Sequence, residues 1–155
     1  MKKGFTFLEL MLVIAILGIL STLIMGNFIT SLKKGRDARR KIDIEQIQKS
    51  LEMYYEDKRE YPPTLSFGGN HQIIDSVSRK VYMQKVPDDP TTTKHYFYST
   101  TADDKYTLYS CLENDQDQGA GVKQDGYGGT DCGNCRTGPN ASLCRFGVSS
   151  GNVSL

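Results

Sequence analysis

The chain has 155 residues, which is enough for one domain of ordinary size. Its 19 basic and 18 acidic residues give a formal net charge of +1. This balance argues against a dedicated nucleic-acid-binding domain, which would be clearly basic, and against an acidic disordered chain. The apolar residues, however, are concentrated near the N-terminus.

Residues 5–29 form a nearly unbroken apolar run, FTFLELMLVIAILGILSTLIMGNFI. A helix of this length, at about 1.5 Å per residue, spans a bilayer core of about 30 Å. A buried core helix is the alternative, but the rest of the chain is too small and too polar to surround it. The run is also too long for a cleaved secretory signal, and no small-residue cleavage site follows it. The run therefore predicts a membrane-inserted helix.

Glu9 is the single charged residue of this run. A carboxylate within a membrane segment costs on the order of 3 kcal/mol unless it lies near the interface, is neutralised or is paired. We find no partner for it within the run, so its presence indicates a functional role.

The residues around Glu9 carry a family resemblance. The segment KKGFTFLE, residues 2–9, resembles the class III signal of type IV filament proteins, meaning pilins and the pseudopilins of type II secretion. The resemblance implies cleavage after Gly4 by a prepilin peptidase and methylation of the new N-terminal residue, Phe5. It also implies that the Glu9 carboxylate pairs a subunit with the N-terminal amine of its neighbour.

A helical pattern continues beyond the apolar run. Apolar residues recur with the spacing of one helix face at Ile44, Ile47, Leu51 and Tyr54. Pro62 and Pro63 end the pattern, because proline cannot continue a helix. The sequence thus predicts one helix over about 5–57, whose second half is amphipathic and packs on a sheet formed later in the chain.

Residues 33–41, KKGRDARRK, hold six basic residues against one acidic residue, Asp37. Such a charge run is usually a solvated face. Contact with anionic lipid headgroups, salt bridges between filament subunits and DNA capture are the functional alternatives. Solvation and subunit contacts are favoured over DNA, because no aromatic residues are interleaved.

The C-terminal region predicts a small sheet. Residues 95–100 (HYFYST) and 105–112 (KYTLYSCL) have strand patterns, and Asp103-Asp104 lies between them as a turn, so a β-hairpin is expected. Residues 64–80 are interpreted as loop or a short helix. The fold class is α+β: a long N-terminal helix packed on a small antiparallel sheet, as in the pilin fold, with a loop-rich C-terminal tail.

The segment 113–131 is rich in Gly, Asn and Asp, and the plain interpretation is a polar surface loop. Closely spaced hard oxygen ligands also suit calcium. YTLYSCLENDQ resembles the strand and calcium loop of the major pseudopilin, and this resemblance makes Asp115 and Asp117 the expected ligands, although the register is blurred by about one residue.

The chain has four cysteines, Cys111, Cys132, Cys135 and Cys144. An even number in an exported small domain predicts disulfides, and four cysteines allow three pairings. A redox pair within Cys132-Gly-Asn-Cys135 and a Cys₄ zinc site remain as alternatives. Export and the uneven spacing favour disulfides.

These features predict a structural protein and no enzyme, since neither His71 nor His95 has a recognisable catalytic context. We expect a leader at 1–4, a transmembrane and assembly segment at 5–29, an amphipathic segment at 30–60 and a globular head at 61–155. The chain would be a single-pass inner-membrane protein with a cytoplasmic N-terminus, later part of an extracytoplasmic filament.

The expected partners are the prepilin peptidase, copies of the chain itself, the inner-membrane assembly platform, and minor pilins or pseudopilins; nucleic acid is not an expected partner. The helix and hairpin resemble the major pseudopilin of type II secretion. The alternative is a type IV pilus pilin for adhesion, motility or DNA uptake. An alternative of another class is a membrane-anchored redox or zinc-binding protein that uses CGNC.

Overall fold

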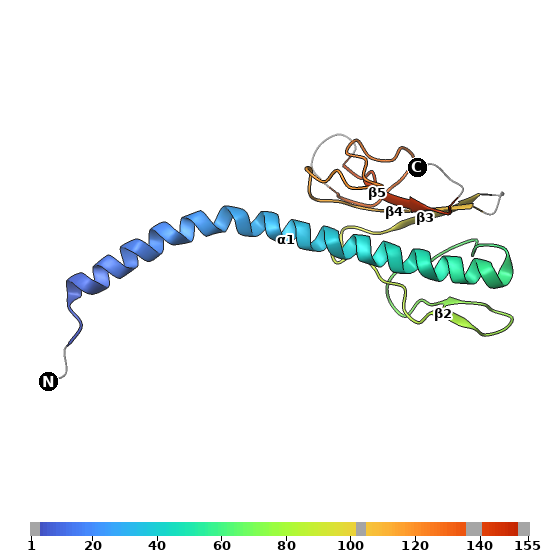
Figure 1. Ribbon diagram of the computed structural model, residues 1–155, viewed down its shortest axis with the longest axis horizontal. Coiled ribbons are helices and arrows are strands. Elements are labelled where there is room, and N and C mark those ends of the chain that lie inside the picture. The colour runs from blue at the N-terminus through green and yellow to red at the C-terminus, as the bar shows by residue number, and fades with distance from the viewer. Residues whose placement is uncertain (1–3, 102–104, 136–140, 152–155) are drawn as a thin grey trace.

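One long helix dominates the protein, and its second half carries a small β-rich head (Figure 1). The computed structural model describes residues 4–101, 105–135 and 141–151. Helix α1 spans Phe7–Lys58, 52 residues, and its first half extends well beyond the head. The expected α+β architecture, a long N-terminal helix packed on a small antiparallel sheet, is confirmed.

Local sequence explains both ends of α1. Thr6 has extended backbone angles and caps the first turn, where its side chain accepts the Glu9 amide. At the other end Arg59 adopts a left-handed conformation with φ of 60°, and its amide donates to the Tyr55 carbonyl. The helix ends just before Tyr61, Pro62 and Pro63, close to the predicted position.

A three-stranded antiparallel sheet lies along one side of the second half of α1 (Figure 1). It has the order β3-β4-β5, with β3 at Phe97–Thr101, β4 at Lys105–Ser110 and β5 at Phe146–Ser149. The predicted hairpin is therefore confirmed as β3 and β4, paired from Phe97 opposite Tyr109 to Thr101 opposite Lys105. The predicted turn residues Asp103 and Asp104 lie outside the described residues, as do leader residues 1–3.

Three strands were not expected from the sequence. β5 pairs with β4, placing Phe146 opposite Ser110, so the C-terminal tail contributes to the sheet. β1 (Ile73–Ile74) and β2 (Val81–Met83) form a short separate ladder across the helix from the main sheet (Figure 1). The expectation of loop or a short helix over 64–80 is thus wrong for Ile73–Ile74, where Ile73 pairs with Met83 and is buried.

The core of the head lies between α1 and the two sheets. Ile44, Ile47 and Leu51 are fully buried, as the helical spacing predicted. β4 alternates in burial, and Tyr106, Leu108 and Ser110 face inward. The buried apolar cluster comprises Ile44, Ile47, Leu51, Ile73, Val86, Tyr96, Tyr106, Leu108, Leu112 and Phe146. This packing fixes the second half of α1 to the head, and the first half extends beyond it (Figure 1).

Candidate functional site

The helix begins with a reciprocal cap between Thr6 and Glu9. The Glu9 amide donates to Thr6 Oγ1 at 3.2 Å, and the Thr6 amide donates to Glu9 Oε2 at 3.4 Å. The expectation that Glu9 has no partner within the apolar run is therefore wrong, because this cap supplies a local one. Gly4 and Phe5 precede the cap in exposed, non-helical backbone.

Exposed apolar side chains cover the first half of α1. Between Phe7 and Leu20 the large apolar side chains are 40–75% exposed, and Phe28, Ile29 and Leu32 continue this surface toward the head. Soluble monomers rarely expose a contiguous apolar surface of this kind, which normally marks contact with protein or membrane. Among the residues described, no helix combines the length and apolar composition that crossing a membrane requires.

Where the head begins, a buried ion-pair network is centred on Arg40 of α1, whose side chain is 0% exposed. Its Nε and Nη2 contact the two carboxylate oxygens of Asp89 at 2.6 and 2.9 Å. Its Nη1 contacts Asp37 at 2.7 Å, and Nη2 also contacts Glu113 at 2.9 Å. One guanidinium therefore joins the helix to two separate loops of the head.

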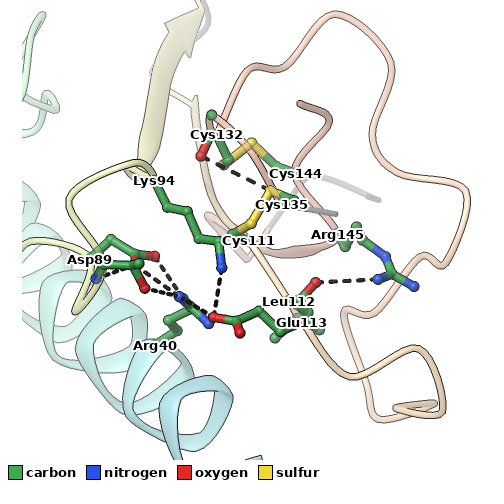
Figure 2. The surroundings of a disulfide bond; sticks show 12 residues. Arg40, Asp89, Lys94, Cys111, Leu112, Glu113, Cys132, Cys135, Cys144 and Arg145 are labelled. Carbon is green, nitrogen blue, oxygen red and sulfur yellow. Dashed lines mark hydrogen bonds and ion pairs between the residues drawn. A yellow bond between two sulfur atoms is a disulfide. The ribbon is translucent and has the colours of Figure 1, made fainter. Parts of the chain in front are cut away.

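Glu113, the third carboxylate of this network, also forms ion pairs with Arg36 and Lys94. The Lys94 ammonium lies 2.6 Å from Glu113 Oε1. Asp37 accepts the backbone amides of Glu113 and Asn114 at 3.0 and 2.8 Å. Figure 2 shows Arg40, Asp89, Lys94 and Glu113 converging beside Cys111. Three cations face three carboxylates, so the charges of the network cancel.

Hydrogen bonds keep Glu113 and Arg40 ionised in spite of their burial. Burial alone would raise the pKa of the Glu113 carboxyl, but hydrogen bonds from Arg36, Lys94 and Arg40 hold it well below its usual range. Burial likewise acts to lower the pKa of Arg40, and its bonds to Asp89, Glu113 and Asp37 raise it above the ordinary value instead. Glu113 and Arg40 are therefore both charged at neutral pH.

The basic run 33–41 is only partly the solvated face that its composition indicated. Lys33, Lys34 and Arg39 are exposed, as expected. For Arg40 and Asp37 the expectation was wrong, since both are buried. The sequence did contain a signal for this burial, because positions 37 and 40 share one helix face with the core positions 44, 47 and 51. The ion pair of Asp37 and Arg40 therefore continues the buried face of α1 toward the N-terminus.

The two aspartates expected to bind calcium each contact a cationic side chain. Asp115 Oδ1 lies 2.7 Å from Arg145 Nη1, and Asp117 Oδ2 lies 2.6 Å from Lys41 Nζ. Within the described segments, no group of three or more His, Cys, Asp or Glu side chains is arranged to hold a metal ion. Calcium binding at Asp115 and Asp117 stays a prediction of the sequence.

All four cysteines form disulfides, Cys111–Cys135 and Cys132–Cys144, one of the three pairings that the sequence left open. Their Cα atoms lie 5.4 and 5.1 Å apart, as disulfide geometry requires. Cys132 and Cys135 therefore bond to distant partners rather than to each other. Because every thiol is bonded, the redox and zinc alternatives are not favoured.

The residues around Cys132, Cys135 and Cys144 form a lobe that the two disulfides hold together, here called the disulfide lobe. A sharp turn between Cys132 and Cys135 brings this lobe against the segment before β3. Gly133 has φ of 77°, and a Cβ there would collide with the Thr93 carbonyl. The His95 amide donates to the Cys132 carbonyl, and the Asn134 amide donates to the Thr93 carbonyl. The disulfide lobe thus holds the segment that carries Lys94 and, through Cys111, the segment that carries Glu113 (Figure 2).

The helix begins at a Thr-x-x-Glu cap, exposes apolar side chains over its first half and carries a small β-rich head on its second half. This combination defines a type IV pilin-like protein. The family described as type II secretion system (T2SS), protein G, matches residues 27–126, and the prokaryotic N-terminal methylation motif matches residues 1–25. The chain therefore belongs to the protein G family of type II secretion systems, whose members are structural pseudopilins and not enzymes.

Curated relatives agree with this assignment. The chain is 29% identical over 122 residues to the type II secretion system core protein G of Aeromonas hydrophila, covering 70% of this chain and 81% of that protein. The protein of the same name from Escherichia coli K12 is 26% identical, with 70% and 80% covered. That from Klebsiella michiganensis is 28% identical, with 84% and 89% covered. No solved structure matches the chain.

These matches support a pseudopilin of type II secretion over a type IV pilus pilin. They are also consistent with processing by a prepilin peptidase and with assembly into a filament.

Proposed function

We propose that this pseudopilin is inserted in the inner membrane through residues 5–29, cleaved after Gly4, methylated on Phe5 and then polymerised through α1 into the filament of a type II secretion system. The observation that supports this most is the first half of α1, which exposes apolar side chains and extends well beyond the described part of the head (Figure 1). In the membrane, lipid would cover this surface; in the filament, the helices of neighbouring copies would cover it.

The residues at the proposed cleavage point are accessible. Gly4 and Phe5 lie before the Thr6 cap, and Phe5 is 76% exposed. A peptidase needs an extended, reachable peptide bond, which the interior of a helix does not offer. The Thr6 cap would let α1 keep its first turn after the leader has been removed.

Glu9 is the proposed contact between subunits. Cleavage would leave a positively charged amine on Phe5, near the exposed start of the helix. In a filament core of low dielectric constant, an unpaired carboxylate and an unpaired ammonium would both be costly, and pairing them between neighbouring copies would relieve both costs. The Thr6 cap is a weaker partner, because its hydrogen bonds to the carboxylate are long, at 3.4 Å.

The proposed partners follow from this cycle. The prepilin peptidase would act first, an inner-membrane assembly platform would add subunits, minor pseudopilins would share the filament, and the growing filament would push secreted substrates outward. The pseudopilin itself would perform no chemistry.

The experiment compares Glu9→Gln with Glu45→Gln, a matched change at an exposed position in the second half of the same helix. Each variant is expressed with the secretion genes, and filaments are counted by electron microscopy. We expect Glu9→Gln to lose filaments while its head keeps both disulfides, and Glu45→Gln to assemble normally. Normal filaments from Glu9→Gln would overturn the proposed pairing.

A further inference from the structure

The segment that follows β4 holds three carboxylates, Glu113, Asp115 and Asp117, and each contacts a cationic side chain from another part of the chain. The sequence left this segment open between a polar surface loop and, by resemblance to the major pseudopilin, a calcium loop. Calcium takes about six to eight oxygen ligands, several of them carboxylates free to face the ion. The contacts of each carboxylate therefore decide whether the loop fits such an ion.

Glu113 is committed to the buried network. Its oxygens receive Arg36, Arg40 and Lys94, and its side chain is only 9% exposed. Turning this carboxylate toward a calcium ion would withdraw it from three cations at once. Arg40 and Lys94 are themselves 0% and 8% exposed, so solvent could not replace the lost contact.

Asp115 is held by Arg145, whose side chain is 2% exposed. Arg145 Nη1 donates to Asp115 Oδ1 at 2.7 Å. It also donates to the Leu112 carbonyl at 3.2 Å (Figure 2). Its Nε and Nη2 are buried and have no hydrogen-bond partner among the described residues. A calcium ion bound by Asp115 would take the carboxylate from this buried guanidinium and would place two positive charges beside it.

Asp117 is satisfied in the same way. Its Oδ2 lies 2.6 Å from Lys41 Nζ, and its Oδ1 accepts the Gly119 amide at 3.0 Å. Among the described residues of this segment, Gln124 Oε1 is a buried acceptor without a hydrogen-bond partner, and one neutral oxygen does not make a calcium site.

Disulfides anchor the chain just after β4, at Cys111, and just before β5, at Cys144. Cys111 lies two residues before Glu113 and bonds to Cys135, and Cys144 directly precedes Arg145 and bonds to Cys132. The Arg145 amide donates to the Ser110 carbonyl, which fixes the returning chain next to β4. A metal ion is thus not needed to bring the two ends of the loop together.

From these contacts we infer that cationic side chains of the chain itself, together with the two disulfides, hold the loop after β4 in place of a divalent cation. Lys41 and Arg145 neutralise the two expected calcium ligands, and Arg36, Arg40 and Lys94 neutralise Glu113. The head of this pseudopilin therefore folds and keeps its stability independently of calcium.

Thermal unfolding of the oxidised full chain in detergent micelles tests the inference, with circular dichroism as the readout. The midpoint is measured in excess calcium chloride, in excess magnesium chloride and in chelator. We expect the three midpoints to agree within about 1 °C. A saturable rise specific to calcium would overturn the inference; a ligand at a hundred times its Kd would raise the midpoint by on the order of 10 °C.

The variant Lys41→Met gives a second test of whether Lys41 or calcium neutralises Asp117. Its matched control is Lys49→Met, because Lys49 is an exposed lysine of the same helix. We expect Lys41→Met to lower the midpoint equally with calcium and with chelator, and Lys49→Met to leave it unchanged. If Asp117 were a calcium ligand, removing the competing ammonium would strengthen calcium binding. A rise of the Lys41→Met midpoint with calcium contradicts the inference if the wild-type midpoint rises with calcium as well, and the wild-type titration still decides if this variant does not fold.

Discussion

Arg40 of α1 and Asp89 of the loop after β2 form a two-point ion pair that is completely removed from solvent. The two N–O distances are 2.6 and 2.9 Å, and both side chains are 0% exposed. The residues are 49 positions apart in the sequence. Parallel hydrogen bonds between a guanidinium and a carboxylate fix orientation as well as distance. This pair therefore sets how the loop after β2 meets the helix.

Removing one partner of this pair should destabilise the head strongly. Asp89→Asn leaves the Arg40 guanidinium buried with one carboxylate fewer, and breaking a buried ion pair in this way costs about 3 kcal/mol or more. For a chain of this size the unfolding midpoint should fall by on the order of 10 °C. Thermal unfolding of the oxidised full chain in detergent micelles measures the change.

Arg39→Met is the matched control for this prediction, because Arg39 neighbours Arg40 but its side chain is 72% exposed. Its contact with Asp43 is long, at 4.0 Å, so its loss should change stability by about 0.5 kcal/mol or less. If Asp89→Asn and Arg39→Met had equal effects, the buried pair would not hold the head in the way described.

The stability of the head should decrease in acid because of Glu113. Its pKa lies below the ordinary value of 4.5, since the hydrogen bonds from Arg36, Lys94 and Arg40 outweigh the opposing effect of burial. As the pH falls below about 4.5, the unfolded chain binds a proton that the folded head does not. The contribution of Glu113 is thus complete above this pH and is lost as the pH falls toward the folded-state pKa.

Unfolding midpoints measured between about pH 3 and pH 7 test this pH dependence. Glu113→Gln should be less stable than the wild type at neutral pH, and its midpoint should change less across the acidic range. Asp75, whose pKa is lowered by hydrogen bonds from Ser78 and Val77, should keep part of the slope in both proteins. Parallel curves for the two proteins would show that Glu113 does not titrate as described.

Peptide mapping under non-reducing conditions should recover two linked pairs, Cys111–Cys135 and Cys132–Cys144. Replacing Cys132 and Cys144 together by serine should cost about 2–4 kcal/mol, because the bond restricts the unfolded chain. The lobe that holds Lys94 and Glu113 would loosen with it. A peptide containing a Cys132–Cys135 bond, or four free thiols after export, would contradict the structure.

Repetitive and local features of the fold were predictable from the sequence. The long helix follows from an apolar run continued by Ile44, Ile47 and Leu51, and each of these residues has the burial that its spacing predicts. The hairpin β3–β4 follows from two aromatic and alternating segments close together in the sequence. Both patterns repeat within a few residues, so they can be recognised from a single sequence without knowledge of distant contacts.

Features that depend on distant partners were not predictable. β5 is a four-residue segment, FGVS, whose strand character comes from pairing with β4 and from Cys144 just before it. Arg40 lies in a basic run of solvent-facing composition, and its burial is tolerable because Asp89 and Glu113, far along the chain, pair with it in addition to Asp37. The disulfide pairing was likewise left open, because spacing alone does not distinguish three connectivities.

Processing at the Gly4–Phe5 bond tests the pseudopilin assignment most directly. Mass spectrometry of the protein recovered from cells that contain the secretion system measures its mature N-terminus. We predict an N-terminal peptide that begins at Phe5, carries one methyl group on its amine and contains Glu9. A chain that retains Met1, or one cut elsewhere and unmethylated, would contradict the assignment.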